Sequence, residues 1–467
     1  MADLKNTIFV NSKKVEVNNV HHDITLLDWL RNHHRMTGTK EGCAEGDCGA
    51  CSVIIDENGS GSSRPINSCL IRLGQVMGRS VTTIEGVGCV KNPHPLQIAF
   101  TNEHASQCGY CTPGFIMSGI SLLNSNKKIT DETINDAISG NLCRCTGYSP
   151  IIKAIKSVAK NRITQNNSQS INKIKKITLG NVTYLKPSNL KELKKYLDEI
   201  KSFQFLAGGT DLNLQRPIIN QKEDKIICLD SITELNTIKH FKEKIVLGGG
   251  VTIESFLEAV RLKMPELVEI LQRFGSPQIR NQGTVGGNLC TSSPIGDIAP
   301  ILLVLNSDLN VFGRNGSKKI NIKNFFKGYR KNVLQKDEII SSVEIPFANK
   351  KNKIFSWKLS KRYDQDISTV SLAINIQTHK NIIKELHLAA GGVAAIPKML
   401  DNLSKQMLEK KIDDAIRFAI DNLEQYIQPI SDLRGSSHYR LEAIKGLFRR
   451  LQTCLIQNKN SLSIMDF

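Results

Sequence analysis

Eight of the twelve cysteines lie in the first third of the chain and form two sets of four. One set has the spacing C-x4-C-x2-C and a fourth cysteine after seventeen further residues: Cys43, Cys48, Cys51 and Cys69. The other consists of two close pairs that are thirty-one residues apart: Cys108, Cys111, Cys143 and Cys145. The first spacing is typical of plant-type 2Fe–2S ligation, in which four thiolates complete two tetrahedral irons. The sequence therefore predicts two 2Fe–2S clusters, and two clusters in one polypeptide predict electron transfer.

The segment around the first set has the composition of a loop. Gly42, Gly46 and Gly49 are interspersed with its cysteines, and glycine permits backbone conformations and close approaches that are closed to other residues. Main-chain N–H groups can then point at the sulfur atoms, and such hydrogen bonds help to set the reduction potential of a cluster. We therefore expect the main chain of this loop to approach its cluster closely.

A disulfide framework and a zinc site are the other interpretations of these cysteines. Disulfides fit poorly, because nothing marks the chain as secreted and cytosolic thiols stay reduced. Zinc stays open for the second set, since paired cysteines also suit tetrahedral zinc, although Cys143-Arg144-Cys145 is tighter than the usual zinc-binding pair. The other cysteines have no partner at ligand spacing and are interpreted as small buried or incidental thiols: Cys89, Cys228, Cys290 and Cys454.

Composition limits the classes of function. A chain of 467 residues, 40% of them hydrophobic, predicts a globular protein of roughly three or four domains. The net charge of +18 suggests nucleic-acid binding, but only 6% of the residues are aromatic and the lysines are widely spread, so we expect a solvated basic surface and no nucleic-acid partner. No apolar run could form a signal peptide or a membrane span, so we expect a cytoplasmic protein without a membrane partner.

Hydrophobic patterns predict an α+β segment followed by a helical one. In residues 1–85, a hairpin is expected from Thr7–Val10 and Lys14–Val17, then a helix that begins after Thr25 and runs through His34. In residues 86–160, three helices are expected: one that Pro113 opens and that runs through Leu123, one over Asp131–Ser139, and one that Ser149 caps. The polar stretch 161–176 predicts an exposed linker. The rest mixes strands and helices, has a break near Asn349–Lys353, and ends in helices over Ile412–Tyr426 and Arg440–Gln457.

Two glycine-containing loops follow apolar runs in the middle of the chain. The first is Phe205, Leu206, Ala207, Gly208, Gly209, Thr210, Asp211 and Leu212, and the second is Thr284, Val285, Gly286, Gly287 and Asn288. Consecutive glycines let main-chain N–H groups surround an anion such as a pyrophosphate, although plain turns have the same composition. Neither loop has the G-x-G-x-x-G fingerprint of a Rossmann site. Because clusters carry single electrons, a cofactor that handles electron pairs is expected beside them, and a flavin meets this need.

Three motifs resemble those of the molybdenum hydroxylase (xanthine oxidase) family: GCAEGDCGAC at 42–51, QCGYCTPG at 107–114 and NLCRCTGY at 141–148. The resemblance covers nearly the whole chain and implies a multidomain α+β protein. Its parts would be a β-grasp ferredoxin-like domain (1–85), a four-helix 2Fe–2S-binding bundle (86–160), a linker (161–176), a two-subdomain α+β FAD-binding domain of the PCMH type (177–350) and an α+β flavoprotein C-terminal domain like that of CO dehydrogenase (351–467).

The resemblance also implies which residues contact FAD. Both glycine loops align with the FAD loops of the family, and four further positions match its FAD contacts: Phe274, Asp297, Ile340 and Lys358. Two departures are visible, because Ile340 stands where the family has leucine and Gly208-Gly209 where it has Gly-Asn. Gln107 is placed toward the pterin side of the second cluster.

The resemblance finally implies a role in electron transfer. A separate large subunit would bind molybdopterin and hydroxylate xanthine and hypoxanthine to urate, in a heterotetramer of two small and two large subunits. Electrons would pass through the helical-domain cluster, the ferredoxin-like cluster and FAD to NAD, and no residue of this chain would be catalytic in the hydroxylation. The alternatives are the equivalent part of an aldehyde, nicotinate or CO hydroxylase and, in another class, a zinc-stabilised nucleic-acid-binding module.

Overall fold

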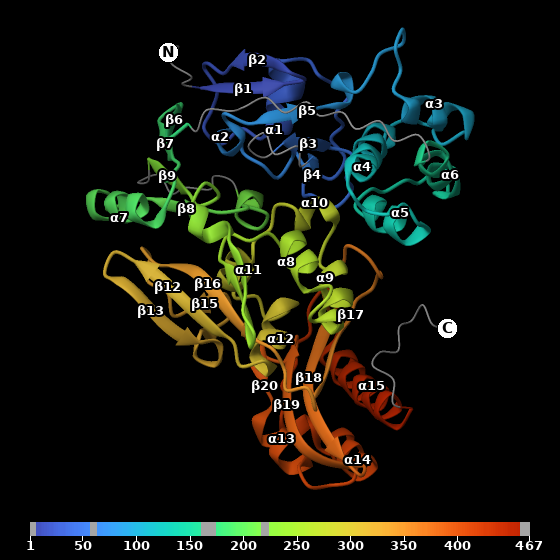
Figure 1. Cartoon of the computed structure of the whole chain (residues 1–467), viewed down its shortest axis with the longest axis vertical. Coiled ribbons are helices and arrows are strands. Elements are labelled where there is room, and N and C mark those ends of the chain that lie inside the picture. Colours follow the sequence, from blue (N-terminus) through green and yellow to red (C-terminus); the bar gives the residue numbers. More distant parts are fainter. Residues whose placement is uncertain (1–5, 57–62, 160–173, 216–223, 458–467) are drawn as a thin grey trace. The chain divides into compact units, whose positions relative to one another are not determined.

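The computed structural model describes residues 6–56, 63–159, 174–215 and 224–457. The chain forms two compact units. The N-terminal unit comprises residues 1–232 together with the inserted segment 275–283, and the C-terminal unit comprises 233–274 and 284–467. In Figure 1 the N-terminal unit is coloured mainly blue to green and the C-terminal unit mainly yellow to red. Each unit is described by itself.

The N-terminal unit begins with a five-stranded mixed sheet in the order β2-β1-β5-β3-β4 (Figure 1). Its strands are β1 (Thr7–Val10), β2 (Lys13–Glu16), β3 (Ser52–Asp56), β4 (Ser63–Asn67) and β5 (Ser80–Thr82). The predicted hairpin is confirmed, with β2 one residue earlier than expected, and its turn residues Asn11 and Ser12 have φ values of 50° and 66°. The predicted helix is also present: Thr25 caps α1 (Leu26–Asp28), which continues as a π-helical turn over Trp29–His33.

The two faces of this sheet pack against different partners because side chains alternate along a strand. On β3, Val53 and Ile55 lie in one hydrophobic core and Ile54 lies in another. The core that contains Ile54 belongs to four helices, α3 (Pro95–Asn102), α4 (Thr112–Asn124), α5 (Asp131–Ile138) and α6 (Ser149–Val158). A single strand therefore joins the first cysteine segment to the helical domain.

Three of the four helices of residues 86–160 agree closely with the sequence pattern, whereas α3 is expected only from the four-helix bundle that the resemblance implies. The helix α4 begins at Thr112 with Cys111 at its N-cap position, and α5 ends just before Gly140, as expected. The cap of α6 differs, because Tyr148 occupies the N-cap position and Ser149 is the first helical residue. The reason is a turn in which Gly147 and Tyr148 have φ values of 67° and 68°, so the helix can start directly after Tyr148.

A second, four-stranded sheet in the N-terminal unit has the order β6-β7-β9-β8. It consists of β6 (Lys176–Leu179), β7 (Val182–Leu185), β8 (Gln204–Leu206) and β9 (Lys225–Cys228), and α7 (Leu190–Glu199) connects β7 to β8. Of the predicted linker, residues 161–173 lie outside the described ranges, and β6 begins at its last predicted residue. This sheet shares one hydrophobic core with the first sheet, since Tyr184 and Ile226 pack in the same cluster as Ile8 and Val53.

The C-terminal unit begins with an antiparallel sheet in the order β10-β11-β16-β12-β13. Its strands are β10 (Ile238–His240), β11 (Lys244–Gly248), β12 (Asp308–Gly313), β13 (Gly316–Asn321) and β16 (Ile339–Pro346). Four helices share a hydrophobic core with this sheet: α8 (Ile253–Val260), α9 (Val268–Gln272), α11 (Val285–Thr291) and α12 (Ile298–Val304). This core contains Phe256 and Leu302, both of which are fully buried.

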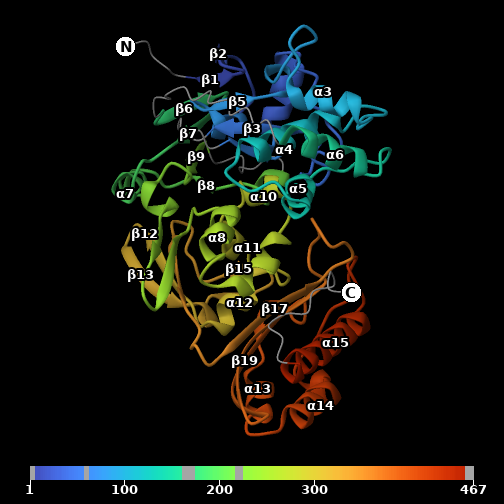
Figure 2. The same ribbon diagram turned by 45° about the vertical axis from the view of Figure 1, so that its right-hand side comes forward.

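The rest of the C-terminal unit is a sheet of the order β17-β18-β19-β20 between helical layers. It contains β17 (Lys353–Leu359), β18 (Val370–His379), β19 (Ile382–Gly391) and β20 (Lys398–Met399). The helices α13 (Asp401–Met407), α14 (Ile412–Asn422) and α15 (Ser437–Ile456) gather on one side of it (Figures 1 and 2). The two last predicted helices are confirmed with small shifts at their ends. The mixed secondary structure of both units agrees with the predicted α+β class, and no helix within the described ranges is long and apolar enough to cross a bilayer.

The shared core of the two N-terminal sheets should depend on Tyr184. This side chain is fully buried, and its hydroxyl donates a 2.7 Å hydrogen bond to the carbonyl of His22. We expect Tyr184→Phe to destabilise the unit by about 1–3 kcal/mol, because the buried carbonyl loses its partner, and Tyr184→Ala by about 3–5 kcal/mol. The measurement is the urea concentration at half-unfolding. The half-exposed Ile98 of α3 provides the control, since Ile98→Ala should change stability by less than about 0.5 kcal/mol.

Candidate cofactor sites

The first cysteine set converges in two pairs. Cys43 and Cys48 lie in the loop before β3, where the N–H of Cys43 donates to the Cys48 sulfur at 3.3 Å. Cys51 immediately precedes β3 and Cys69 follows β4, and their sulfurs are 3.3 Å apart. Two thiolates per iron is the arrangement that a 2Fe–2S cluster needs. The antiparallel pairing of β3 with β4 brings the fourth cysteine to the loop, although seventeen residues separate it from the third.

Main-chain donors surround the Cys43 sulfur, as the sequence predicts. The N–H groups of Asp47 and Cys48 donate to it at 3.3 Å, and that of Glu45 at 3.5 Å. The hydrogen bond with the Cys48 side chain and these main-chain donors lower the pKa of Cys43 to about 5, against the effect of burial. The same contact raises the pKa of Cys48. The loop therefore favours one thiolate in the pair, which is the form that binds iron.

The backbone of this loop has the unusual conformations that its glycines predict. Gly46 and Gly49 have φ values of 80° and 67°, and Ala44 adopts a positive φ of 58° without being glycine. A Cβ atom on Gly42 would lie 2.7 Å from the Cys48 sulfur, so Gly42 is required for close approach. The side chain of Asn67 on β4 donates to the Gly46 carbonyl at 2.9 Å and fixes the loop against the sheet.

The second cysteine set also forms two pairs. The sulfurs of Cys108 and Cys145 are 3.6 Å apart, and the side chains of Cys111 and Cys143 interact. Burial opposes ionisation of Cys143, but hydrogen bonds from the Thr146 side chain and main chain lower its pKa overall. Burial raises the pKa of Cys111 to about 12.

The two sets differ in their exposure to solvent. Cys51 and Cys69 are buried, whereas Cys108 and Cys145 are exposed. The exposed residues around the second set include two large apolar side chains, Tyr110 at 49% and Leu142 at 42%, and the predicted pterin-side residue Gln107. The second set is therefore the more exposed of the two, while Cys43 and Cys48 of the first set are partly buried, like Cys111 and Cys143 of the second.

The segments that carry the two sets touch through their main chains. The N–H of Leu142 donates a 3.0 Å hydrogen bond to the carbonyl of Cys48. Leu142 directly precedes Cys143 in the chain. The path from Cys48 of the first set to Cys143 of the second therefore consists of one hydrogen bond and one peptide bond. This contact requires small residues, because a Cβ on Gly49 would lie 2.1 Å from the Gly140 carbonyl and one on Gly114 2.4 Å from the Gly49 carbonyl.

The first glycine loop, 205–212, lies in the same unit as both cysteine sets. It follows β8, and a Cβ on Gly208 would lie 1.9 Å from the Gln282 carbonyl, so glycine is required there. The loop is tied to the first cysteine set at Leu70, the neighbour of Cys69. The Leu70 carbonyl accepts from the Asn213 side chain at 2.7 Å and from that of Gln282 at 3.4 Å. Gln282 also donates to the Gly208 carbonyl at 2.7 Å.

The second glycine loop lies in the C-terminal unit. Thr284 caps α11 by accepting from the Gly287 N–H at 3.0 Å. Gly286 donates to the Gly249 carbonyl at 2.9 Å and packs so closely that a Cβ on it would lie 2.6 Å from that atom. Gly287 and Asn288 are partly exposed, whereas Val285 and Gly286 are buried. The accessible part of this loop is therefore its Gly287-Asn288 end.

The C-terminal unit also brings together three of the four single positions that the resemblance implies. The buried Lys358 ammonium donates to Asp297 Oδ2 at 2.9 Å, to the Arg273 carbonyl at 2.7 Å and to the Asp366 carbonyl at 2.9 Å. Phe274 follows Arg273 in the chain and packs against the core of the unit. Lys358 thus holds Asp297 and the main chain beside Phe274 in place, and its predicted direct contact with FAD stays a prediction.

The fourth position, Ile340, is 3% exposed and lies in the core of the C-terminal unit. Its carbonyl is the atom that a Cβ on Gly249 would meet at 1.9 Å. Since Gly249 in turn contacts Gly286, Ile340 supports the second glycine loop through main-chain packing. Its predicted contact with FAD is untested.

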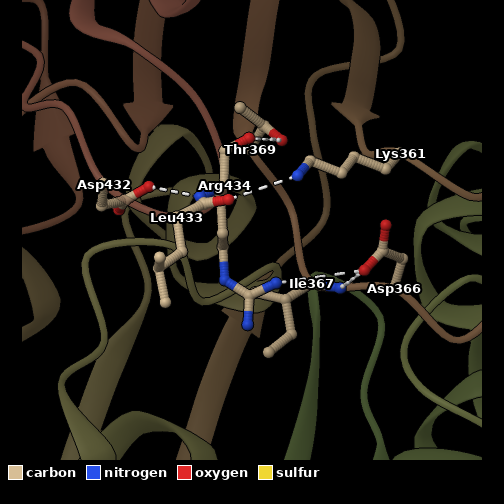
Figure 3. Close-up of a pocket in the computed structure, with 7 residues that line it drawn as sticks. All are labelled: Lys361, Asp366, Ile367, Thr369, Asp432, Leu433 and Arg434. Atoms are coloured by element: carbon tan, nitrogen blue, oxygen red, sulfur yellow. Dashed lines mark hydrogen bonds and ion pairs between the residues drawn. The ribbon is translucent and has the colours of Figure 1, made fainter.

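A pocket of about 320 Å³ lies in the C-terminal unit next to Asp366 (Figure 3). Its lining residues are Lys361, Asp366, Ile367, Thr369, Asp432, Leu433 and Arg434. Lys361 donates to the Leu433 carbonyl at 3.2 Å, and the Arg434 guanidinium is 4.0 Å from Asp366 (Figure 3). The lining has two cationic side chains, Lys361 and Arg434, and two anionic ones, Asp366 and Asp432, so it carries no excess of either charge.

The donor sets fit the cofactors that the sequence predicts. Each cysteine set offers four sulfurs in two pairs, with main-chain N–H donors directed at one of them, which suits the two irons and bridging sulfides of a 2Fe–2S cluster. Both glycine loops have partly exposed glycine main chain, at Gly208, Gly209 and Gly287, which suits the phosphates of FAD.

Comparison with known proteins decides the assignment. Residues 8–73 match the 2Fe-2S iron-sulfur cluster binding domain, 83–156 the [2Fe-2S] binding domain, 178–348 the FAD binding domain in molybdopterin dehydrogenase, and 355–455 the CO dehydrogenase flavoprotein C-terminal domain. The chain belongs to the molybdenum hydroxylase family. It carries two 2Fe–2S domains and an FAD-binding domain, as predicted, so a 2Fe–2S cluster is favoured over zinc in the second domain, and the four cysteines of the second set stay its predicted ligands.

Relatives within the molybdenum hydroxylase family include enzymes with different substrates. The chain is 29% identical to xanthine dehydrogenase/oxidase of Rattus norvegicus over 98% of its own length, 30% identical to xanthine dehydrogenase of Emericella nidulans over 95%, and 29% identical to aldehyde oxidase 1 of Bos taurus over 89%. It spans only 37–39% of the length of these relatives.

Solved structures share the fold. A reconstituted CO dehydrogenase from Oligotropha carboxidovorans superimposes with a TM-score of 0.53 at 21% identity, covering 59% of this chain and 97% of that one. Quinoline 2-oxidoreductase from Pseudomonas putida 86 gives 0.55 at 20% identity, covering 61% and 100%. The predicted fold class is thereby confirmed.

Sequence reasoning missed the residues that connect the sites. Leu70, Leu142, Asn213 and Gln282 form the hydrogen bonds between the cysteine sets and the first glycine loop. Two of them act through main-chain atoms, which leave no mark on the sequence. Asn213 and Gln282 are buried amides, whose position next to glycine loops is the only local signal.

The assignment of the second cysteine set can be tested at Cys143. We expect Cys143→Ser to lose one cluster, so that iron falls from about four to about two per chain while FAD is retained. The measurements are iron, acid-labile sulfide and flavin content of the purified protein. Cys89→Ser is the matched control, because Cys89 is exposed and belongs to neither set. Full iron content in Cys143→Ser would refute this ligand assignment.

The second glycine loop can be tested at Gly287. A Cβ at this position would lie 2.8 Å from the capping Thr284 hydroxyl, on the accessible side of the loop. We expect Gly287→Val to lower the FAD content, because the side chain intrudes where main chain would meet the cofactor. The measurement is the ratio of flavin absorbance to protein. A valine at Gly446 of α15, where a Cβ meets nothing within 4 Å, should leave the ratio unchanged, and equal flavin content in both variants would mean that the 284–288 loop is an ordinary turn.

Proposed function

We propose that this chain is the electron-transfer part of a xanthine dehydrogenase. In this proposal a molybdopterin-binding partner oxidises xanthine and hypoxanthine to urate, and the electrons leave through this chain to NAD in the cytoplasm. The bound clusters supply one-electron transfer and the bound FAD collects electron pairs. The contribution of the protein is to hold each cofactor at a fixed distance from the next. The proposed assembly has two copies of this chain and two of its partner.

The observation that carries the proposal is the order of contacts within the N-terminal unit. The second cysteine set lies at the surface, and its segment bonds to the first set through Leu142 and Cys48. The first set bonds through Leu70 to Asn213 and the first glycine loop. The first set therefore stands between the other two sites, which is the order that a relay from a surface partner to a flavin requires.

The surface around the second cysteine set supports a partner at that end of the relay. Cys108 and Cys145 are exposed beside the half-exposed apolar side chains of Tyr110 and Leu142. Aromatic and aliphatic side chains of this kind are common in the centres of protein interfaces. We propose that the molybdenum-bearing partner docks there and that Gln107 faces it.

The choice of substrate rests on the relatives. Xanthine dehydrogenases are among the most similar curated proteins, and aldehyde oxidases follow at the same level of identity. The second candidate is therefore the equivalent part of an aldehyde-oxidising enzyme, with nicotinate and CO hydroxylases as further possibilities within the family. The substrate pocket itself would lie on the partner, so the residues of this chain do not distinguish these candidates.

The proposed function predicts a specific redox response of the native complex. Under anaerobic conditions, we expect xanthine to bleach the absorbance of the clusters and of the flavin, and NAD to restore it. The measurement is a visible absorbance spectrum after each addition, with an aldehyde, nicotinate and carbon monoxide as parallel substrates. Bleaching by an aldehyde but not by xanthine would favour the second candidate, and recovery with oxygen but not with NAD would make the enzyme an oxidase.

A further inference from the structure

The segment 275–283 leaves the C-terminal unit and packs as part of the N-terminal one. It contains the short helix α10 (Pro277–Arg280), which Ser276 caps. The match to the FAD-binding domain includes this segment, yet its side chains contact the iron–sulfur part of the chain. None of the predicted cofactor contacts lies within it.

Consecutive side chains of this segment bind different elements of the iron–sulfur part. Ile279 packs in an apolar cluster with Cys51, Cys69, Leu27 and Leu70. The buried Arg280 guanidinium is 2.7 Å from Asp136 on α5, and the Asn281 amide donates to the Pro65 carbonyl on β4 at 3.1 Å. Arg280 therefore contacts the helical domain at Asp136, and Asn281 contacts the ferredoxin-like sheet at Pro65.

Gln278 is the member of the segment that binds both domains at once. It is fully buried, and its amide nitrogen lies 3.1 Å from Ser52 Oγ, 3.1 Å from Ser118 Oγ and 3.2 Å from Asn141 Oδ1. Ser52 follows Cys51 of the first cysteine set, and Asn141 stands two residues before Cys143 of the second. Ser118 lies on α4, the helix that begins beside Cys111.

The acceptors of Gln278 belong to one buried network that reaches the contact between the cysteine sets. Asn141 accepts from the Ser118 hydroxyl at 2.7 Å and donates to the Gly49 carbonyl at 3.0 Å. The Ser52 hydroxyl donates to the same carbonyl at 2.7 Å. The Gln278 amide thus closes a ring of hydrogen bonds around Gly49, which lies next to Cys48 in the first cysteine loop.

The carbonyl oxygen of Gln278 shows that this placement is costly. It has no hydrogen-bond partner among the described residues, although it is buried. It lies close to Gly140, so a side chain at position 140 would clash with it, because a Cβ there would lie 1.8 Å from this oxygen. Since an unpaired buried acceptor lowers stability, a purely structural role would be met better by an apolar side chain. The three contacts of the nitrogen are what the amide adds.

We propose that Gln278 is a positioning residue that fixes the distance and orientation between the two 2Fe–2S clusters. It acts through Ser52 and Asn141, which adjoin the two cysteine sets, and holds the Leu142–Cys48 contact in register. In this proposal, a residue within the part of the chain that matches the FAD-binding domain positions the two clusters relative to each other. This inference rests on the two-cluster assignment and is independent of substrate, acceptor and partner.

The test is electron paramagnetic resonance of the full chain with clusters and FAD bound, reduced by dithionite. In the native protein, the magnetic interaction between the two reduced clusters should split or broaden their signals. We expect Gln278→Leu, which keeps the volume and removes the amide, to change this interaction while iron content stays at the native level. Transfer of an electron between the clusters, followed by freeze-quench after photoreduction of the flavin, should be slower than in the native protein, because the tunnelling rate falls as the separation of the clusters grows.

Arg280→Met and Asn281→Ala are the matched controls, because they remove the ion pair with Asp136 and the hydrogen bond to Pro65 in the same segment and leave Gln278 in place. Both should leave the magnetic interaction unchanged even where they lower thermal stability. Ser118→Ala is the milder second variant, since it removes one acceptor of Gln278 without altering the segment, and an intermediate change is expected. If Gln278→Leu retains all its iron and shows the same magnetic interaction as the native protein, the proposal is wrong. If Gln278→Leu fails to retain iron, a spectrum of Ser118→Ala identical to that of the native protein would overturn the proposal instead.

Neither outcome depends on the proposed enzyme activity. Dithionite and photoreduction require no purine, no NAD and no partner, so the magnetic measurement stands if xanthine proves not to be the substrate. Conversely, a failure of the Gln278 variants leaves the bleaching of the native complex by xanthine untouched. The two hypotheses can therefore be rejected separately.

Discussion

The structure of the N-terminal unit depends on a main-chain contact between two cysteine segments that are far apart in sequence. Leu142 donates to the carbonyl of Cys48, and two glycines allow the segments to approach to this distance: Gly49 and Gly114. A side chain at either glycine would force the segments apart. The rate of electron transfer between cofactors depends on their separation. This contact therefore helps to set the distance between the two clusters. The surrounding elements, from β3 to α10, hold it in place.

Much of the fold and of the candidate sites could be predicted from local patterns. The cysteine spacings predicted both 2Fe–2S domains, and proline, glycine and serine placed three of the four helices of residues 86–160 within a residue or two. These predictions succeeded because cysteine spacing and helix ends are local features of the sequence. The glycine loops were also recognised, and the match to an FAD-binding domain gives them their proposed role.

The sequence could not show the contacts made across domain boundaries. The two N-terminal sheets share a core through Tyr184, so the predicted boundary between the iron–sulfur part and the FAD part runs through continuous packing. Likewise, the polar side chains of Gln278, Arg280 and Asn281 have no pattern that indicates burial, because the partners shown for them lie on distant segments. The lysine at 358 illustrates the same limit: resemblance implies a cofactor contact, and the structure shows an ammonium that binds Asp297 and two carbonyls.

Binding a cofactor and placing it are therefore tasks of different residues in this chain. The residues predicted to bind are cysteines and glycines in short motifs, and a substitution among them should remove or deplete a cofactor. Buried amides such as Asn141, Asn213 and Gln278 connect the motifs, and each hydrogen-bonds to main chain or side chains beside a motif without belonging to the predicted ligands. Amides suit this task because one planar group can donate and accept without carrying charge into a buried site. A charged side chain in the same place would shift the potential of a nearby cluster by its field, whereas an amide can fix the geometry and disturb the potential much less.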